Sequence, residues 1–258
     1  MGTTGSPQQS RPTRDAVRPV LERMVRRAGL GDDDACRFWR IFDLLTRESL
    51  DFAQTAALRR FSGICRDGTP WQFCVAMGSQ SASLRFLTEV GSPASLLRER
   101  TRLTLTRMID LFALIGAADQ AETAEVLAEL TPPDDDHIAG LWVGVAVTGH
   151  GAPRVRLYAN NGWGDATERW LRLTRALRQL NAGGFGAMLQ PLLPLLVPAF
   201  SPNGFAVTVP ASRPVCKLYL RPTIRPWGTV RALAGAVLAH HADALIGAIE
   251  DERVRMVR

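Results

Sequence analysis

Two patterns of apolar spacing alternate along this chain. Some segments place apolar residues three and four positions apart, which is typical of an amphipathic helix, and others alternate apolar and polar residues, which is typical of a strand. The strand-like segments come in pairs separated by turn-forming residues. We predict three hairpins, over residues 71–90, 141–160 and 204–221. We predict helices in the remaining segments, over about 14–28, 35–59, 94–117, 119–130, 165–181, 184–198 and 226–250.

The helices and hairpins form a repeating unit. The second strands of the last two hairpins share a basic residue, a leucine and a tyrosine, at 156–158 and 217–219, which are 61 residues apart. Residues 85–87 (Arg-Phe-Leu) hold the corresponding place in the first hairpin. Such internal similarity indicates a repeat architecture. We therefore predict an α+β fold of ααββ repeats whose strands form one antiparallel sheet.

Each predicted strand has an apolar face and a polar face, because side chains alternate between the two sides of a strand. The polar faces carry basic and tyrosine side chains, with one tryptophan, one amide and one carboxylate: Gln72, Arg85, Glu89, Trp142, Arg154, Arg156, Tyr158, Lys217, Tyr219 and Arg221. We expect the helices to cover the apolar faces. The polar faces would then line the lumen of a closed or partial barrel, or, as the alternative, meet solvent as in many antiparallel sheets.

The charge on the polar face favours an anionic ligand. Five cations in one lumen could not be a dry core, because buried charges need partners. Arginine forks and a lysine ammonium suit a phosphate or diphosphate. Tyrosine can donate a hydrogen bond, or present its ring face to a cation. Binding of an anionic small molecule without catalysis remains an alternative to an enzyme at this point.

Several motifs resemble those of the aromatic prenyltransferases that are similar to dimethylallyltryptophan synthase. They are the segment 67–73 (Asp-Gly-Thr-Pro-Trp-Gln-Phe), Arg85 on the following strand, and the two basic-x-tyrosine strands. The resemblance covers roughly residues 36–222. It implies the ABBA fold, in which ααββ repeats wrap ten antiparallel strands into a barrel. It also implies transfer of a dimethylallyl or longer prenyl group from its diphosphate to an aromatic acceptor, an indole, tryptophan or peptide, without a metal or other cofactor.

The same resemblance implies roles for individual residues. Arg85, Arg156 and Lys217 would bind the departing diphosphate, with Arg154 and Arg221 on the same face. Tyr158 and Tyr219 would screen the allylic cation from water.

Two departures from the family pattern concern the acceptor and the barrel. The family places a carboxylate that accepts the indole N–H where this chain has Gln72, and a glutamine can accept that hydrogen bond but cannot act as a base. Glu89 is the nearest alternative carboxylate, and Trp142 or the layer of Gln72 would position the acceptor. Only three of the family's five hairpins are found, so the barrel would be smaller, would close by self-association, or would belong to a degenerate relative.

Composition narrows the class further. With 258 residues and 46% hydrophobic residues, the chain suits one core, which we place at 35–258 after a basic leader and first helix at 1–34. Six arginines against two acids within residues 1–30 contribute +4 of the net charge of +6. A basic leader is more often a solvated arm than a nucleic-acid surface, so we expect no nucleic-acid partner.

The remaining sequence features point to a cytoplasmic protein without a metal site. No apolar run approaches the ~20 residues of a membrane span, and the N-terminus has no signal-peptide core. The four cysteines stand alone, and we expect them to be buried small side chains. The acidic runs 32–34 and 134–136 lie where helix N-caps are expected, without the spacing of a magnesium-diphosphate motif.

Overall fold

Six antiparallel strands form a single sheet in which each strand pairs with its neighbour in sequence. The computed structural model describes residues 14–50, 62, 64–65, 70–77, 82–92, 95–135, 137, 139–149, 151–209, 215–223 and 235. The strands are β1 (Trp71–Met77), β2 (Ala82–Thr88), β3 (Leu141–Thr148), β4 (Arg154–Asn160), β5 (Phe200–Val209) and β6 (Val215–Pro222). The three predicted hairpins and their order are confirmed.

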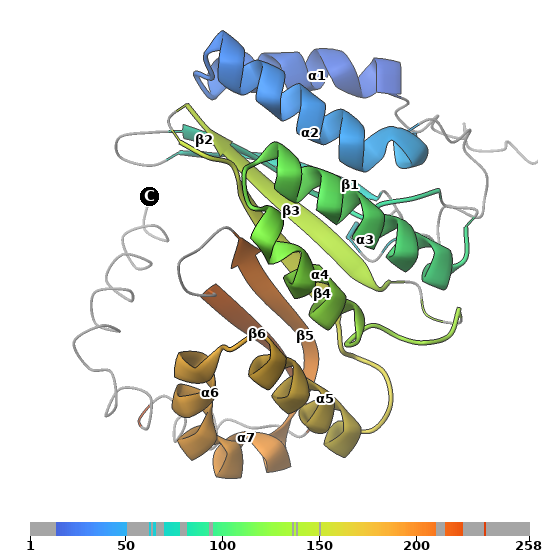
Figure 1. Ribbon diagram of the computed structural model, residues 1–258, viewed down its shortest axis with the longest axis vertical. Helices are drawn as coiled ribbons and strands as arrows, with labels where there is room; N and C mark the ends of the chain where they lie inside the picture. Colours follow the sequence, from blue (N-terminus) through green and yellow to red (C-terminus); the bar gives the residue numbers. More distant parts are fainter. Residues whose placement is uncertain are drawn as a thin grey trace, which may run out of the picture.

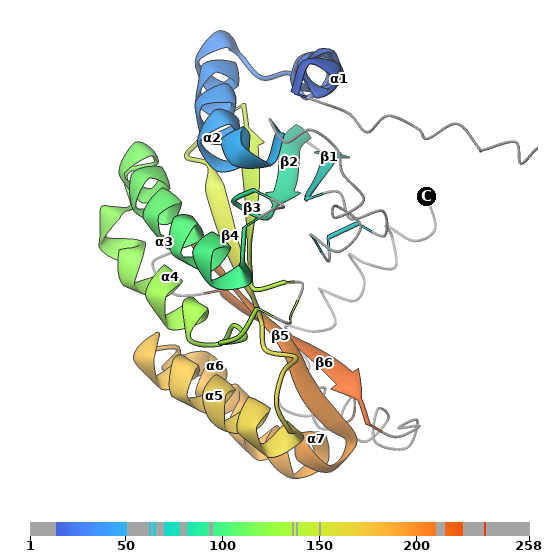
Figure 2. The same ribbon diagram turned by 90° about the vertical axis from the view of Figure 1, so that its right-hand side faces the viewer.

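Helices cover one side of this sheet. The described helices are α1 (Arg14–Arg27), α2 (Asp32–Leu50), α3 (Leu97–Leu114), α4 (Ala121–Ala128), α5 (Ala166–Gln179), α6 (Gly183–Leu189) and α7 (Leu193–Ala199), with short 3-10 turns η2 (Ala118–Gln120) and η3 (Gln190–Leu192). Figure 1 shows the helices in chain order along the sheet, and Figure 2 shows α2 to α5 on one side of a curved sheet. Among the described helices, α2 to α5 leave the other side of the sheet uncovered.

The core lies between the sheet and these helices. Burial alternates strictly along β3, whose Val143 and Val147 are fully buried, as the apolar pattern predicts. From the helical side, Leu111 and Phe112 of α3 and Leu173 of α5 are equally inaccessible. Burying a side chain of this size stabilises the fold by about 1.5–3 kcal/mol. The apolar face of the sheet thus fixes which face remains polar.

The first helix packs on the same core. Leu21 of α1 is fully buried, and Val17 and Val25, each one turn away, are nearly so. The guanidinium of Arg18 lies 5.4 Å from the ring of Trp39 on α2. The described part of the basic leader is thus a packed helix, while the division of the chain at residue 34 stays a prediction.

Several element boundaries differ from those predicted, and four of the differences are informative. α2 begins at Asp32, so the acidic run forms its first turn instead of preceding it, where carboxylates interact favourably with the helix dipole. The helix expected over 184–198 divides into α6, η3 and α7, because Pro191 and Pro194 lack the N–H that a continuous helix needs. The helix expected from 119 begins as η2. β5 begins at Phe200 instead of 204, and its pairing shifts between Pro202 and Gly204.

Some expected features lie outside the described residues. They are residues 51–59 of the second predicted helix, the segment 67–69 and the helix over 226–250. None of the helices that the structure describes is long and apolar enough to cross a membrane.

Candidate functional site

A cavity of about 410 Å³ lies on the polar face of the sheet. All six strands contribute to its lining, which consists of Gln72, Cys74, Arg85, Phe86, Leu87, Gly144, Val145, Ala146, Arg154, Val155, Arg156, Tyr158, Thr208 and Val215. Three arginines, a tyrosine and a glutamine thus share one hollow with small and apolar residues. The strand alternation in the sequence predicted that these five polar residues would face the same way.

The strand register arranges the lining in two rows. One row runs from Cys74 through Arg85 and Ala146 to Arg154. The adjacent row crosses all six strands, through Gln72, Leu87, Gly144, Arg156, Thr208 and Val215. Small residues separate the arginines of β2 and β4, so the space between the guanidiniums is open. That spacing leaves room for a ligand between cations on different strands.

Hydroxyl groups, and no carboxylates, orient two of these arginines. Nε of Arg85 donates to Oγ of Ser83 at 3.0 Å, and Nε of Arg156 donates to Oγ1 of Thr208 at 2.9 Å. Within the described part of the chain, none of the ion pairs involves Arg85, Arg154 or Arg156. The positive charge of the cavity is therefore not neutralised by the described protein groups.

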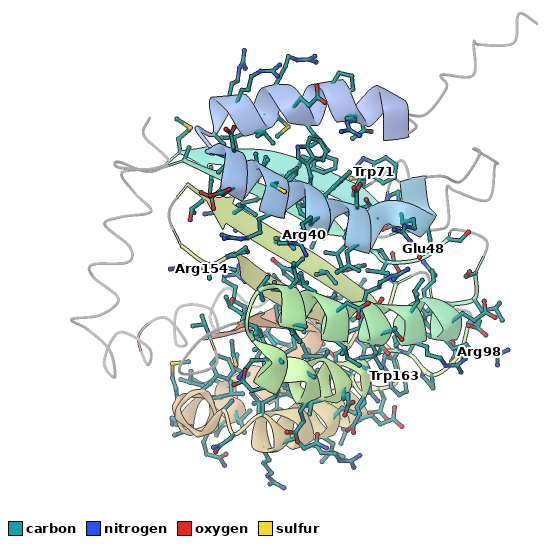
Figure 3. All side chains as sticks on the ribbon, turned by 45° about the horizontal axis from the view of Figure 1, so that its top comes forward. Arg40, Glu48, Trp71, Arg98, Arg154 and Trp163 are labelled. Atoms are coloured by element: carbon teal, nitrogen blue, oxygen red, sulfur yellow. The ribbon has the colours of Figure 1, made fainter. Side chains whose placement is uncertain are left out.

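Arg154 begins β4 and lies at one end of the sheet. Figure 3 labels it on the opposite side of the molecule from Trp163, which follows the other end of that strand. Trp163 is held away from the cavity, because its Nε1 donates to the carbonyl of Leu130 at 2.8 Å and the Arg172 guanidinium lies 3.5 Å from its ring. Arg85 lies in the same row of the sheet as Arg154, so two of the three cavity arginines lie at this end of the site.

The only two tyrosines of the chain meet on this face. Their ring centroids are 6.3 Å apart and the ring planes are inclined by 41°. Burial raises the pKa of Tyr219, and Tyr158 adds to the rise while Arg156 opposes it. Tyr219 itself is 43% exposed and does not line the cavity. The pair therefore extends the polar surface from the arginines toward β6.

Three further predicted residues lie on the same face but outside the cavity lining. Lys217 faces Ala206 in the strand register, Arg221 faces Ser201, and Trp142 faces Tyr158. The two cations of β6 are exposed, whereas Nε1 of Trp142 is buried. The structure thus places Lys217 and Arg221 farther along the face than the three arginines of the cavity.

Glu89 is enclosed instead of lining the cavity. It follows β2, is 1% exposed, and its Oε1 accepts a hydrogen bond from Nη1 of Arg100 at 2.9 Å. Burial raises the pKa of Glu89 to about 7, while Arg100, Ser62 and Trp142 act in the opposite direction. Burial likewise lowers the pKa of Arg100, against the effect of Glu89. This buried pair fastens α3 to the end of β2.

Nine of the fourteen lining residues were not among the predicted site residues, and two of these nine, Cys74 and Thr208, carry a thiol or a hydroxyl. Thr208 lies two residues after Ala206 on β5 and shares its face, so the strand period predicts its side of the sheet but not its hydrogen bond to Arg156. Cys74 shares its face with Gln72, and the expectation that the cysteines are buried was wrong, because Cys36 and Cys74 are exposed. Within the described residues, no group of three histidine, cysteine or acidic side chains is placed to hold a metal ion.

Comparison with known proteins gives matches only to solved structures; no family model and no curated protein matches. The 5-dimethylallyltryptophan synthase of Streptomyces coelicolor is 20% identical, with a TM-score of 0.65 over 81% of this chain and 59% of that one. The 6-dimethylallyltryptophan synthase of Micromonospora olivasterospora, in complex with DMASPP and Trp, is 22% identical, with a TM-score of 0.62 over 84% and 62% of the two chains. The prenyltransferase PriB is 22% identical, with a TM-score of 0.58 over 75% of this chain and 53% of that one.

This chain has the fold of these prenyltransferases. The ααββ architecture expected from the sequence is confirmed. The chain spans about three-fifths of the length of the two dimethylallyltryptophan synthases and about half of the length of PriB. That share agrees with the three hairpins among the described residues, against the five of the family that the motifs resemble.

Proposed function

We propose that this protein is a prenyltransferase that transfers a dimethylallyl or longer prenyl group from a prenyl diphosphate to an aromatic acceptor. The observation that carries the proposal is the group of three arginines, Arg85, Arg154 and Arg156, that line one cavity without a carboxylate partner among the described residues. A diphosphate supplies the missing negative charge, and guanidinium forks match its oxygens.

The same residues suit the chemistry of the transfer. The bond between the allylic carbon and the diphosphate oxygen breaks, and the diphosphate leaves with the electron pair. Arginines already oriented by Ser83 and Thr208 stabilise that charge without reorganisation. The ring of Tyr158 presents its π face to the allylic cation. A ring carbon of the acceptor then forms the new bond, and the ring proton leaves to solvent.

The residues that would bind the acceptor are where this chain departs from the family that its motifs resemble. Gln72 lines the cavity and can accept a hydrogen bond from an indole N–H, but it has no charge to attract the proton. Glu89 is committed to Arg100. We therefore assign Gln72 to orientation of an indole, tryptophan or peptide side chain, beside Trp142, and we assign no general base.

The setting of the reaction belongs to the same proposal. We place the reaction in specialised metabolism in the bacterial cytoplasm, and we propose that it needs no metal or other cofactor. We assign Lys217, Tyr219 and Arg221 to the rim of the donor site. Association of copies that completes the barrel also remains a proposal.

The direct test is to incubate the protein with dimethylallyl diphosphate or geranyl diphosphate and a panel of indole, tryptophan, phenols and a tryptophan-containing peptide, with and without EDTA. We expect an acceptor that gains the mass of one prenyl unit, with equal yield in EDTA. Arg156→Ala should lose the product, whereas the control Arg175→Ala, an exposed arginine of α5 on the helical side, should retain it.

A non-catalytic barrel that binds an anionic small molecule is the second candidate, and the substitution of Gln72 for the expected carboxylate favours it. Inorganic diphosphate that protects the protein against thermal unfolding, with no product from any acceptor, would support this alternative. Absence of both protection and product would reject the donor site altogether.

A further inference from the structure

Gly144 lies in the middle of β3, where a glycine is unfavourable unless the structure requires one. A glycine inside a strand costs roughly 0.5–1 kcal/mol relative to alanine and packs no side chain. Its φ is not among the positive values found at five other glycines of the described chain, so the backbone does not require it. Its neighbours Val143 and Val145 are buried as in an ordinary strand. The reason for the glycine must therefore be space on the polar face.

That space is taken by the ring of Tyr158. A Cβ at position 144 would lie 3.1 Å from Cε2 of Tyr158, a contact tighter than nine in ten real Cβ contacts. It would also lie 3.6 Å from Cδ1 of Leu87 and 3.5 Å from the carbonyl oxygen of Arg156. The direct register partner of Tyr158 is Trp142, so the tyrosine ring leans diagonally along β3 to reach Gly144.

The contact sets where the ring stands in the cavity. Both Gly144 and Tyr158 line it, and Gly144 faces Arg156 in the strand register. The Tyr158 ring, which lies over Gly144 of β3, therefore forms part of the wall of the cavity that Arg156 also lines. With an alanine at 144 the ring would have to move away from β3 by a few tenths of an ångström.

We propose that Gly144 is a positioning residue that holds the ring of Tyr158 against β3, so that this ring shields the allylic cation from water. The inference rests on the proposed function. Once the bond to diphosphate has broken, the allylic carbon has two fates. It bonds to a ring carbon of the acceptor, which then loses a proton, or it bonds to a water oxygen, which loses a proton and gives a free prenyl alcohol. The position of Tyr158 decides how often water takes part.

The chain offers a matched control in Gly204 of β5. Gly204 faces Tyr219 in the strand register and lies against its side chain, just as Gly144 lies against the ring of Tyr158. Gly204 does not line the cavity. A Cβ at 204 would meet Cβ and Cδ2 of Tyr219 at 3.7 Å, which is ordinary van der Waals contact. Gly204→Ala therefore adds the same methyl group on the same face beside the other tyrosine without displacing it.

The experiment measures the ratio of prenyl alcohol to prenylated acceptor for wild type, Gly144→Ala, Gly204→Ala, Tyr158→Ala and the double variant Gly144→Ala/Tyr158→Ala. Thermal unfolding of each variant confirms that it is folded. We expect Gly144→Ala to raise the ratio about tenfold, a change of about 1.4 kcal/mol between the two barriers. Gly204→Ala should leave it unchanged, and Gly144→Ala should add nothing once Tyr158 is absent.

An unchanged ratio in Gly144→Ala, or an equal rise in Gly204→Ala or in the background without Tyr158, would overturn the assignment while leaving the transferase function intact. If the wild type gives neither product nor alcohol, the proposed function fails. The same variants are then compared by their affinity for dimethylallyl thiolodiphosphate. Non-additive losses at Gly144 and Tyr158 support the positioning, and additive losses overturn it.

Discussion

Arginines play opposite roles at two places on this sheet, the end of β2 and the cavity. At the end of β2, Arg100 is 6% exposed and pairs with Glu89, so both charges are enclosed by the core. In the cavity, Arg85 and Arg156 have hydroxyl partners and no carboxylate among the described residues. The first arrangement holds a helix on the sheet. The second leaves positive charge for something that the protein itself does not provide.

The kind of partner explains the difference. A carboxylate neutralises a guanidinium and competes with an anionic ligand, whereas a hydroxyl that accepts from Nε fixes its direction and leaves its charge. Ser83 and Thr208 lie on different strands, and each fixes one arginine of the cavity. The partner of an arginine, more than its burial, therefore indicates whether its charge stabilises the fold or is available to a ligand.

The largest expected effect concerns the structural pair. Arg100→Ala leaves the carboxylate of Glu89 buried without its cation, and we expect a loss of about 3–5 kcal/mol in the free energy of unfolding. Urea denaturation measures the change. Arg175→Ala, which removes an exposed arginine, should change stability by less than about 0.5 kcal/mol. Equal losses of stability in the two variants would show that the Arg100–Glu89 pair has no special role in holding the fold together.

The pH dependence of the same pair comes next. Because burial raises the pKa of Glu89 from its usual 4.5 to about 7, the folded state binds this proton more tightly than the unfolded state. The stabilisation from that proton is complete below about pH 4.5 and is lost as the pH rises through about 7. Relative to Glu89→Gln, which is neutral at every pH, the wild type should lose up to about 3 kcal/mol across this range. A stability difference independent of pH would show that the pKa of Glu89 is the same in the folded and the unfolded states.

In the cavity the expected effect falls on binding instead of stability. Arg156→Ala should weaken binding of dimethylallyl thiolodiphosphate about tenfold or more, since a hydrogen bond to a charged group is worth about 1.5–3 kcal/mol. Isothermal titration calorimetry measures the affinity, and the unfolding midpoint should stay the same. Lys217→Ala should have a smaller effect, because Lys217 lies outside the cavity lining. The reverse order would move the donor site toward β6.

The smallest effect tests the hydroxyl that orients Arg156. Thr208→Val keeps the shape of the side chain and removes the acceptor for Nε, so the affinity for the same analogue should fall about threefold to tenfold, or about 0.5–1.5 kcal/mol. The control Thr106→Val removes a hydroxyl that contacts the Arg102 carbonyl on α3, away from the cavity. No change in Thr208→Val would mean that the hydroxyl partner of Arg156 has no role in preorganising it.

Much of the site was readable from the chain because strand periodicity is local. Once 154–160 is a strand, Arg154, Arg156 and Tyr158 must share a face, and the apolar residues between them must take the other. The same reasoning put Glu89 on the polar face. It could not reveal that Arg100, 11 residues farther on in a helix, would enclose it, because that contact depends on how α3 packs.

The sequence by itself determined the strands, their order and the side on which each basic or aromatic residue lies, since these follow from a two-residue period and short turns. Only the tertiary structure decided which of those residues converge. Strand register brought Arg85, Arg154, Arg156 and Gln72 around one cavity and left Lys217 and Arg221 beyond it. Helix packing withdrew Glu89 into the core. Register and packing depend on contacts between residues far apart in the chain, and the local pattern carries no measure of those distances.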